Sequence, residues 1–309
     1  MIKEIIIARS YGFCMGVKRA IKIADETARK SDGPVTILNE IVHNEAVVEN
    51  FRRKGVGQKF SVEDVDKGTL IISAHGVEPG IKREAGEKGL TIIDATCPLV
   101  NHIYKIIHKL IPRGYYLIHF GDRNHDETRG VVGHAPDRIT VISSLDELDQ
   151  YPKWQDRKLG LTVQTTMWTE DFKAFREAAK VKWPHIETFD TICDATDKLQ
   201  SAVADMAPVV DIVLVVGSQA SANSKRLANI SQMLCGRGEL IGSAEDIKPD
   251  WFQGENEGIT RVGVTAGAST PDFLVHAVID RLVELSGGVA EVVQQAKSPG
   301  KSQVAGDNS

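Results

Sequence analysis

The feature that most constrains this chain is a pattern of strand, loop and helix that recurs three times, with a period of about 100 residues. A short apolar run opens each copy, at 5–8, 116–119 and 213–216. Further apolar runs that end in polar residues follow later in each copy, at 70–75, 159–165 and 262–266. Strands that alternate with amphipathic helices form parallel sheets through right-handed crossovers. We therefore predict an α/β fold of three pseudo-repeated units, each with a small parallel sheet.

The same periodicity sets the expected domain boundaries. The first unit is predicted at residues 1–97, the second at 98–193 and the third at 194–287. Residues 288–309 lack apolar periodicity and are expected to form a flexible tail. Ligands of parallel sheets bind in the loops beyond the carboxyl ends of the strands, so functional residues are expected there.

Composition narrows the possible partners and the compartment. With 42% hydrophobic and 26% charged residues among 309, the chain has the make-up of a soluble globular protein. It contains no apolar run of about 18 residues. The segment at its start, residues 1–7, is too short and too acidic to be a signal peptide. We therefore expect a cytoplasmic protein that does not bind membranes. The formal net charge of -5 argues against a general nucleic-acid binder.

Three of the four cysteines occur in related contexts. Cys14 lies between glycines just after the first apolar run, whereas Cys97 and Cys193 each end a similar strand-like run. If the three units pack around a pseudo-threefold axis, these thiols can converge, each beside a helix N-terminus that favours an anionic sulfur. Without a Cys-x-x-Cys pair, an iron-sulfur cluster with one non-cysteine position fits better than structural zinc. Three buried structural thiols are the alternative, and Cys235 is expected to be inert.

Polar residues at strand ends or helix starts suggest a site for a polyanion. His43, His75 and His125 occupy such positions in the first two units. The third unit offers hydroxyl and amide donors instead, at Ser218, Ser221, Asn223, Ser224 and Ser269. Helix N-termini and imidazoles both bind phosphate groups, so donors from all three units would form a diphosphate clamp. Taken singly, each of these residues is more often an ordinary capping, surface or core residue.

Several long motifs in one order resemble the LytB/IspH family, from Ile5 to about Leu285. They are Gly-Phe-Cys-Met-Gly-Val at 12–17, Val-His-Asn at 42–44, Ser-Ala-His-Gly-Val at 73–77, Asp-Ala-Thr-Cys-Pro-Leu-Val at 94–100, Gln-Thr-Thr at 164–166, Val-Val-Gly-Ser at 215–218 and Val-Thr-Ala-Gly-Ala-Ser at 264–269. The resemblance implies a cloverleaf of three α/β units around a central iron-sulfur cavity.

The resemblance also implies an activity, the reductive dehydroxylation of 4-hydroxy-3-methylbut-2-enyl diphosphate to isopentenyl and dimethylallyl diphosphate in the non-mevalonate pathway. Cys14, Cys97 and Cys193 would hold a 4Fe-4S cluster. Glu127 would be the proton donor, with Thr165 orienting it and His125 assisting the proton relay. The implied substrate ligands are His43, His75, His125, Thr165, Ser221, Asn223 and Ser269. The chain has no flavin or nicotinamide motif, so a ferredoxin or flavodoxin is expected to supply electrons.

Some positions depart from the family pattern, namely Asp126, Arg129, Lys198, Leu199 and Ala222. Ala222 removes one hydroxyl from the expected diphosphate clamp, a loss of roughly 1 to 3 kcal/mol if a phosphate oxygen stays unpaired. A diverged copy with a related substrate or weaker activity is therefore one alternative. A non-catalytic iron-sulfur redox sensor or electron carrier is another, and a zinc hydrolase using Cys, His and Glu ligands is the third.

Overall fold

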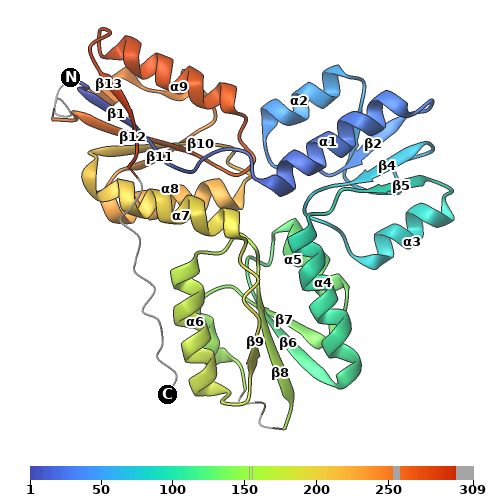
Figure 1. Ribbon diagram of the computed structural model, residues 1–309. Helices are drawn as coiled ribbons and strands as arrows, with labels where there is room; N and C mark the ends of the chain where they lie inside the picture. The colour runs from blue at the N-terminus through green and yellow to red at the C-terminus, as the bar shows by residue number, and fades with distance from the viewer. Residues whose placement is uncertain (153, 155, 253–257, 297–309) are drawn as a thin grey trace, which may run out of the picture.

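The structure, a computed structural model, describes residues 1–152, 154, 156–252 and 258–296. These residues form three lobes, each built on its own sheet (Figure 1). Every strand pairing in the three sheets is parallel. The predicted α/β class, with three small parallel sheets arranged as a cloverleaf, is confirmed.

Lobe 1 has a four-stranded sheet in the order β3-β2-β4-β5. Its strands are β2 (Val35–Leu38), β3 (Gly57–Lys59), β4 (Thr69–Ile72) and β5 (Thr91–Asp94). Its helices are α1 (Met15–Lys30), α2 (Glu45–Arg53) and α3 (Pro79–Glu87). Helices α1 and α2 pack on one face of the sheet through Val17 and Phe51, and α3 covers the other face through Ala85.

Lobe 2 repeats this arrangement with the strand order β7-β6-β8-β9. Its strands are β6 (Tyr115–Phe120), β7 (Ile139–Ile142), β8 (Lys158–Val163) and β9 (Glu187–Thr188). Its helices are α4 (Pro98–Leu110), α5 (Asp126–Gly133) and α6 (Thr169–Lys182). Ile103 of α4 and Val131 of α5 pack on one face, while Phe172 and Phe175 of α6 pack on the other.

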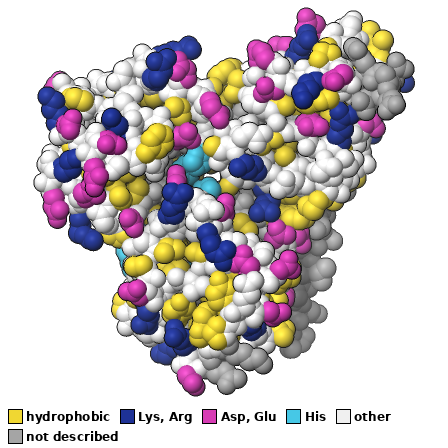
Figure 2. Space-filling model, turned by 180° about the vertical axis from the view of Figure 1, so that it is seen from behind, with side chains coloured by type: hydrophobic (Ala, Val, Ile, Leu, Met, Phe, Trp, Pro, Cys, Tyr) yellow, Lys and Arg dark blue, Asp and Glu magenta, His cyan; other side chains and the backbone are white. Residues whose placement is uncertain are grey.

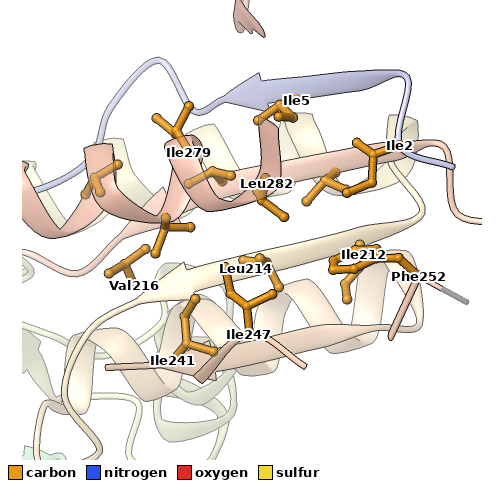
Figure 3. Close-up of a cluster of buried hydrophobic side chains, with 14 of the residues drawn as sticks. Ile2, Ile5, Ile212, Leu214, Val216, Ile241, Ile247, Phe252, Ile279 and Leu282 are labelled. Carbon is orange, nitrogen blue, oxygen red and sulfur yellow. The ribbon is translucent and has the colours of Figure 1, made fainter. Parts of the chain in front are cut away.

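Lobe 3 has a five-stranded sheet in the order β11-β10-β12-β1-β13. Its strands are β1 (Glu4–Ile7), β10 (Ile212–Val216), β11 (Gly238–Ile241), β12 (Arg261–Ala266) and β13 (Glu291–Gln294). Its helices are α7 (Asp194–Met206), α8 (Ala222–Cys235) and α9 (Asp272–Leu285). Helix α9 buries Ile279 and Leu282 against Ile5 and Leu214 of the sheet (Figure 3), and α7 and α8 cover the opposite face.

The inner strands of these sheets are mostly apolar because helices cover both faces of each sheet. All residues of β10 and of β4 are buried. Within the described residues, no helix is both long enough and apolar enough to cross a membrane.

The structure corrects the predicted place of the first strand. Residues 5–8 were assigned to the first unit, but β1 lies between β12 and β13 in the sheet of lobe 3. The strand of lobe 1 that corresponds to β6 and β10 is β2, which also lies next to the central strand of its sheet. An apolar run buries equally well in any of the three sheets, so its sequence does not tell which sheet it joins. The boundaries after 97 and 193 stay a prediction.

With β1 placed in lobe 3, the three cysteine segments become equivalent. Each sheet has the same order over its first four positions, and β5, β9 and β1 occupy the fourth position in their sheets. Each is followed by one cysteine and then by a helix of the next lobe, α4, α7 or α1. Each of the three cysteines therefore follows a strand of one sheet and precedes a helix that packs on another sheet.

The predicted tail is wrong for part of its length. Residues 291–294, within the expected flexible segment 288–309, form β13 and pair with β1. The Gln295 N–H also donates to the carbonyl of Ile7 at 2.8 Å. This strand has only four residues, Glu-Val-Val-Gln, which is too short for a pattern of apolar and polar residues to be recognised in the sequence. Residues 297–309 lie outside the described residues.

Candidate active site at the junction of the lobes

A cavity lies where the three lobes meet, and it brings together most of the residues singled out in the sequence. Ser218 and Ser224 do not line it, and the Ser218 hydroxyl donates to Glu45 Oε1 at 2.7 Å instead. Histidine side chains are visible near the middle of the molecule in Figure 2. The nominated residues that line the cavity are Cys14, His43, His75, Cys97, His125, Glu127, Thr165, Cys193, Ser221, Asn223 and Ser269. Residues from three distant parts of the chain thus share one site.

The three cysteines are the N-cap residues of α1, α4 and α7. The Cys14 sulfur accepts a hydrogen bond from the Val17 N–H at 3.4 Å. Gly16, in the first turn of α1, lies directly against two of the sulfurs. A Cβ atom at this position would lie 2.7 Å from Cys97 Sγ and 3.8 Å from Cys14 Sγ, so these two sulfurs are neighbours across the glycine. Only a residue without a side chain leaves room for both.

Burial governs the ionisation of these thiols. It raises the pKa of Cys14 and of Cys97, and the negative charge that Cys193 would carry nearby raises both further, against the helix N–H groups that lower them. The helix N-termini therefore do not by themselves make anionic sulfurs here. A cationic metal centre would compensate both the burial and the mutual repulsion. The cysteines are free and half-buried, and their clustering fits such a group. Cys235 ends α8 instead and is absent from the cavity lining.

Glu127 is the buried acid of the cavity, with 2% of its surface exposed. It is the second residue of α5 and meets Thr165, which follows β8. The Thr165 N–H donates to Glu127 Oε1 at 2.7 Å, and the Thr165 hydroxyl donates to Oε2 at 2.6 Å. Burial raises the pKa of Glu127 to about 7, although the two bonds from Thr165 lower it. The carboxyl group can therefore hold a proton near neutral pH.

His125 caps the helix that carries Glu127. Its Nδ1 accepts a hydrogen bond from the Glu127 N–H at 3.2 Å. The neutral ring must then carry its hydrogen on Nε2, which makes that atom a donor. Burial, followed by the nearby His43, lowers the pKa of His125 to about 4. The ring is thus a neutral hydrogen-bond donor at neutral pH.

Two histidines from lobe 1 stack beside it. The rings of His43 and His75 lie 4.1 Å apart and nearly parallel, and the His125 ring meets both edge-on. His43 Nδ1 is 2.8 Å from Glu40 Oε2, and the His43 carbonyl accepts from the Ser269 hydroxyl at 2.9 Å. Burial, then the charges of His43 and His125, lower the pKa of His75.

Lobe 3 contributes the start of α8. Ser221 is the N-cap residue, and its oxygen accepts from the Ser224 N–H at 3.2 Å, which leaves its hydroxyl hydrogen free to donate. Both polar atoms of the Asn223 amide are buried and make no hydrogen bond to the described residues, and the same is true of His75 Nδ1. Buried polar atoms normally have partners, so a polar ligand in the cavity is the simplest partner for them.

The departures from the family pattern fall in different environments. Ala222, the first residue of α8, lines the cavity where a hydroxyl was expected. The side chain of Arg129 is 65% exposed and donates to the Asn124 carbonyl at 2.6 Å. Lys198 is exposed on α7, and Leu199 is buried in the core between α7 and the sheet. Ala222 alone among these four lines the cavity.

The sequence did not reveal the residues that hold the nominated ones in place. Glu40 orients His43, and Gln164 ties the loop before α5 to the segment of Thr165. The Gln164 side chain accepts from the Asp122 N–H at 2.8 Å and donates to Thr166 at 3.0 Å. The position of Gln164 within Gln-Thr-Thr was the only signal for it.

The chain is similar to known proteins along most of its length. A family model described as LytB protein matches residues 5–283. A 4-hydroxy-3-methylbut-2-enyl diphosphate reductase of Symbiobacterium thermophilum is 39% identical over 297 residues, which cover 93% of this chain and 99% of the relative. A reductase with the same name from Wolbachia pipientis wMel is 40% identical over 305 residues, which cover 94% of this chain and 97% of the relative.

Two solved structures are also similar to this chain. The E-1-hydroxy-2-methyl-but-2-enyl-4-diphosphate reductase of Plasmodium falciparum superposes with a TM-score of 0.90 at 30% identity, over 96% of this chain and 93% of that one. A second structure, of an (E)-4-hydroxy-3-methyl-but-2-enyl diphosphate reductase described as the terminal enzyme of the non-mevalonate pathway, is 35% identical with a TM-score of 0.64. The match covers 92% of this chain and 100% of the chain in that structure.

Proposed function

This chain belongs to the LytB protein family, and we propose that it reduces 4-hydroxy-3-methylbut-2-enyl diphosphate in the cavity between its lobes. The reaction removes the allylic hydroxyl group as water, consumes two electrons and two protons, and gives isopentenyl and dimethylallyl diphosphate. The observation that carries the proposal is that the candidate metal ligands, the acid and the diphosphate donors all line one cavity.

Cys14, Cys97 and Cys193 are the proposed ligands of a 4Fe-4S cluster. Their support is the convergence of three helix N-caps and the space that Gly16 leaves beside two sulfurs. When bound, such a cluster supplies the electrons and a Lewis acid for cleavage of the carbon-oxygen bond. With only three cysteines at the site, one iron would have no thiolate ligand from the protein.

Glu127 is the proposed proton donor. Its raised pKa keeps a proton on the carboxyl group near neutral pH, and Thr165 fixes both of its oxygens. Transfer of that proton to the departing oxygen turns hydroxide into water, a much better leaving group. The Nε2–H of His125, the cap of the same helix, is a donor for the proton relay.

The diphosphate is proposed to bind His43, His75 and His125 on one side and Ser221, Asn223 and Ser269 on the other. The free amide of Asn223 and the N-terminus of α8 offer donors to an anion. Ala222 supplies no donor, so the clamp has one hydroxyl fewer than the family pattern. An external ferredoxin or flavodoxin is the proposed electron source, because the sequence has no motif for a redox nucleotide.

An anaerobic assay tests this function. Cluster-loaded protein, reduced with dithionite or a viologen, is mixed with the allylic diphosphate, and the products are identified by mass spectrometry. Formation of both isoprenoid diphosphates with reoxidation of the cluster is expected. A loaded protein that is not reoxidised by the substrate would instead be an electron carrier or a redox sensor, and the proposal would be wrong.

A further inference from the structure

Three titratable side chains outside the cavity lead from the surface of lobe 2 toward its buried acid. They are His108 and Tyr104 on α4 and His134 at the end of the neighbouring α5 (Figure 1), and none of them lines the cavity. Glu127 gives up a proton in every turnover of the proposed reaction, on which this inference rests, and has to regain one before the next. We propose that His108, His134 and Tyr104 form the path that returns this proton from solvent.

Tyr104 is the inner end of the path, next to the acid. Its hydroxyl group is packed between Gly76 and Gly130. A Cβ atom at Gly130 would lie 2.7 Å from the hydroxyl oxygen, and one at Gly76 would overlap it. Gly130 lies one turn beyond Glu127 on the same face of α5. Burial, followed by the charge of Glu127, raises the pKa of Tyr104, so the hydroxyl keeps its proton close to the carboxyl group.

Two buried polar atoms along the path have no protein partner. The Tyr104 hydroxyl and His134 Nε2 make no hydrogen bond to the residues that the structure describes. Their rings pack against each other, with centroids 4.0 Å apart. Leaving two buried polar atoms unpaired is unfavourable, and each such atom calls for an explanation. One water molecule between the hydroxyl and Nε2 would pair both atoms and connect them for proton transfer.

His108 is the outer end of the path. Its Nε2 lies 2.9 Å from His134 Nδ1, and its side chain is exposed to solvent. Burial, then His108 and Lys82, lowers the pKa of His134 to about 4, so its ring is neutral at neutral pH. When His108 donates to Nδ1, the neutral His134 ring carries its own hydrogen on Nε2. That hydrogen lies on the buried side, where the Tyr104 hydroxyl is.

The transfer moves one proton inward and leaves no charge behind. A solvent proton adds to His108 Nδ1 as the Nε2 hydrogen of that ring passes to His134 Nδ1. The Nε2 hydrogen of His134 then passes through the water to the Tyr104 oxygen, whose own hydrogen goes to the Glu127 carboxylate. Both imidazole rings regain their first tautomers by exchange with water.

Tyr104→Phe tests the path, because it keeps the ring between the two glycines and removes only the hydroxyl. Anaerobic, cluster-loaded full-length protein is mixed at about pH 6 with excess chemical reductant and the allylic diphosphate, and product is followed by rapid quench. Glu127 starts protonated below its pKa of about 7, so the first turnover should proceed at the wild-type rate. Later turnovers should be slowed at least about tenfold, because the proton returns slowly.

His134→Ala should show the same pattern, and added imidazole should restore its later turnovers by replacing the lost ring. Two matched controls should turn over like the wild type. Tyr116→Phe also removes a hydroxyl in lobe 2, one that pairs with Thr140 at 2.6 Å and does not line the cavity. His102→Ala removes an exposed histidine from the same helix as His108.

Wild-type rates in the later turnovers of both Tyr104→Phe and His134→Ala would overturn the inference. A first turnover slowed as much as the later ones would also overturn it, because the two residues would then only hold the site in shape. If Tyr104→Phe loads less iron than the wild type, His134→Ala with and without imidazole decides the case. A wild type that forms no product would refute the proposed function itself, whereas an active wild type with unaffected variants refutes this path alone.

Discussion

Thr165 holds both carboxylate oxygens of Glu127, one through its backbone N–H and the other through its hydroxyl. The carbonyl of the same threonine accepts a hydrogen bond from the Cys193 N–H at 3.0 Å. Thr165, two residues after the end of β8, therefore sets the position of the acid relative to one of the cysteines. A small displacement of Thr165 would therefore move both the Glu127 carboxyl group and Cys193.

Replacing Glu127 with glutamine tests its role as the acid. Glu127→Gln keeps the size of the side chain and removes the transferable proton, so turnover should fall about 10²-fold to 10⁴-fold. Iron content and affinity for the diphosphate should change little, because the cysteines and the diphosphate donors are intact. Steady-state kinetics with a chemical reductant measure the effect. Unchanged turnover would remove Glu127 from the acid role.

The pH dependence of turnover should follow the protonation of Glu127. The acid must be protonated to act, so turnover of the wild type should fall as the pH rises through about 7. Thr165→Val removes the hydroxyl bond that lowers this pKa, so the fall should move to higher pH even though the maximal rate drops. Thr165→Ser keeps the hydroxyl and should restore the wild-type profile. Identical profiles for wild type and Thr165→Val would contradict the assignment.

The cysteines can be separated by single substitutions. Changing Cys14, Cys97 or Cys193 to serine should abolish most of the visible absorption and bound iron of anaerobically purified protein. Cys235→Ser is the control, because this thiol lies at the end of α8, with its sulfur 3.2 Å from the Arg237 carbonyl. Zinc in place of iron in the wild type would refute the cluster and favour a hydrolase.

Substitution of Gly16 should reduce iron binding as strongly as substitution of one of the three cysteines. In Gly16→Ala the new methyl group would lie 2.7 Å from the Cys97 sulfur, too close for either to stay in place. We expect a large loss of iron per chain. Gly86→Ala is a matched control in α3, where a new Cβ meets nothing within 4 Å. Equal iron contents in the two variants would show that the close approach does not matter.

Buried His119 should make stability depend on acid pH. Burial, followed by His125, lowers its pKa to about 3, and its Nδ1 pairs with the Thr162 hydroxyl at 3.0 Å. Because the unfolded chain takes up this proton near pH 6.5, the free energy of unfolding should fall as the pH drops from about 6.5 toward 3, by about 1.4 kcal/mol per pH unit. Urea unfolding of wild type and His119→Leu/Thr162→Val measures the difference. The double variant should show a slope smaller by this amount, and an unchanged slope would refute the argument.

The sequence alone determined the kinds of element and much of the chemistry. Apolar periodicity is a local property, so the repeated strands and helices could be read directly. The contexts of the cysteines indicated a metal centre, and the resemblance to a known family indicated the role of Glu127. The nominated cavity residues were each found at a strand end or helix start, where parallel sheets bind ligands.

Only the tertiary structure decided how these pieces meet. It placed β1 in lobe 3, which made Cys14 equivalent to Cys97 and Cys193. It joined Thr165 to Glu127, and it brought Asp126 of lobe 2 to His43 and His75 of lobe 1. Such contacts join residues that are far apart in the sequence, and they depend on how the helices and strands pack against one another. The local pattern of apolar and polar residues does not specify that packing, because many arrangements of the same helices and strands would bury their apolar faces equally well.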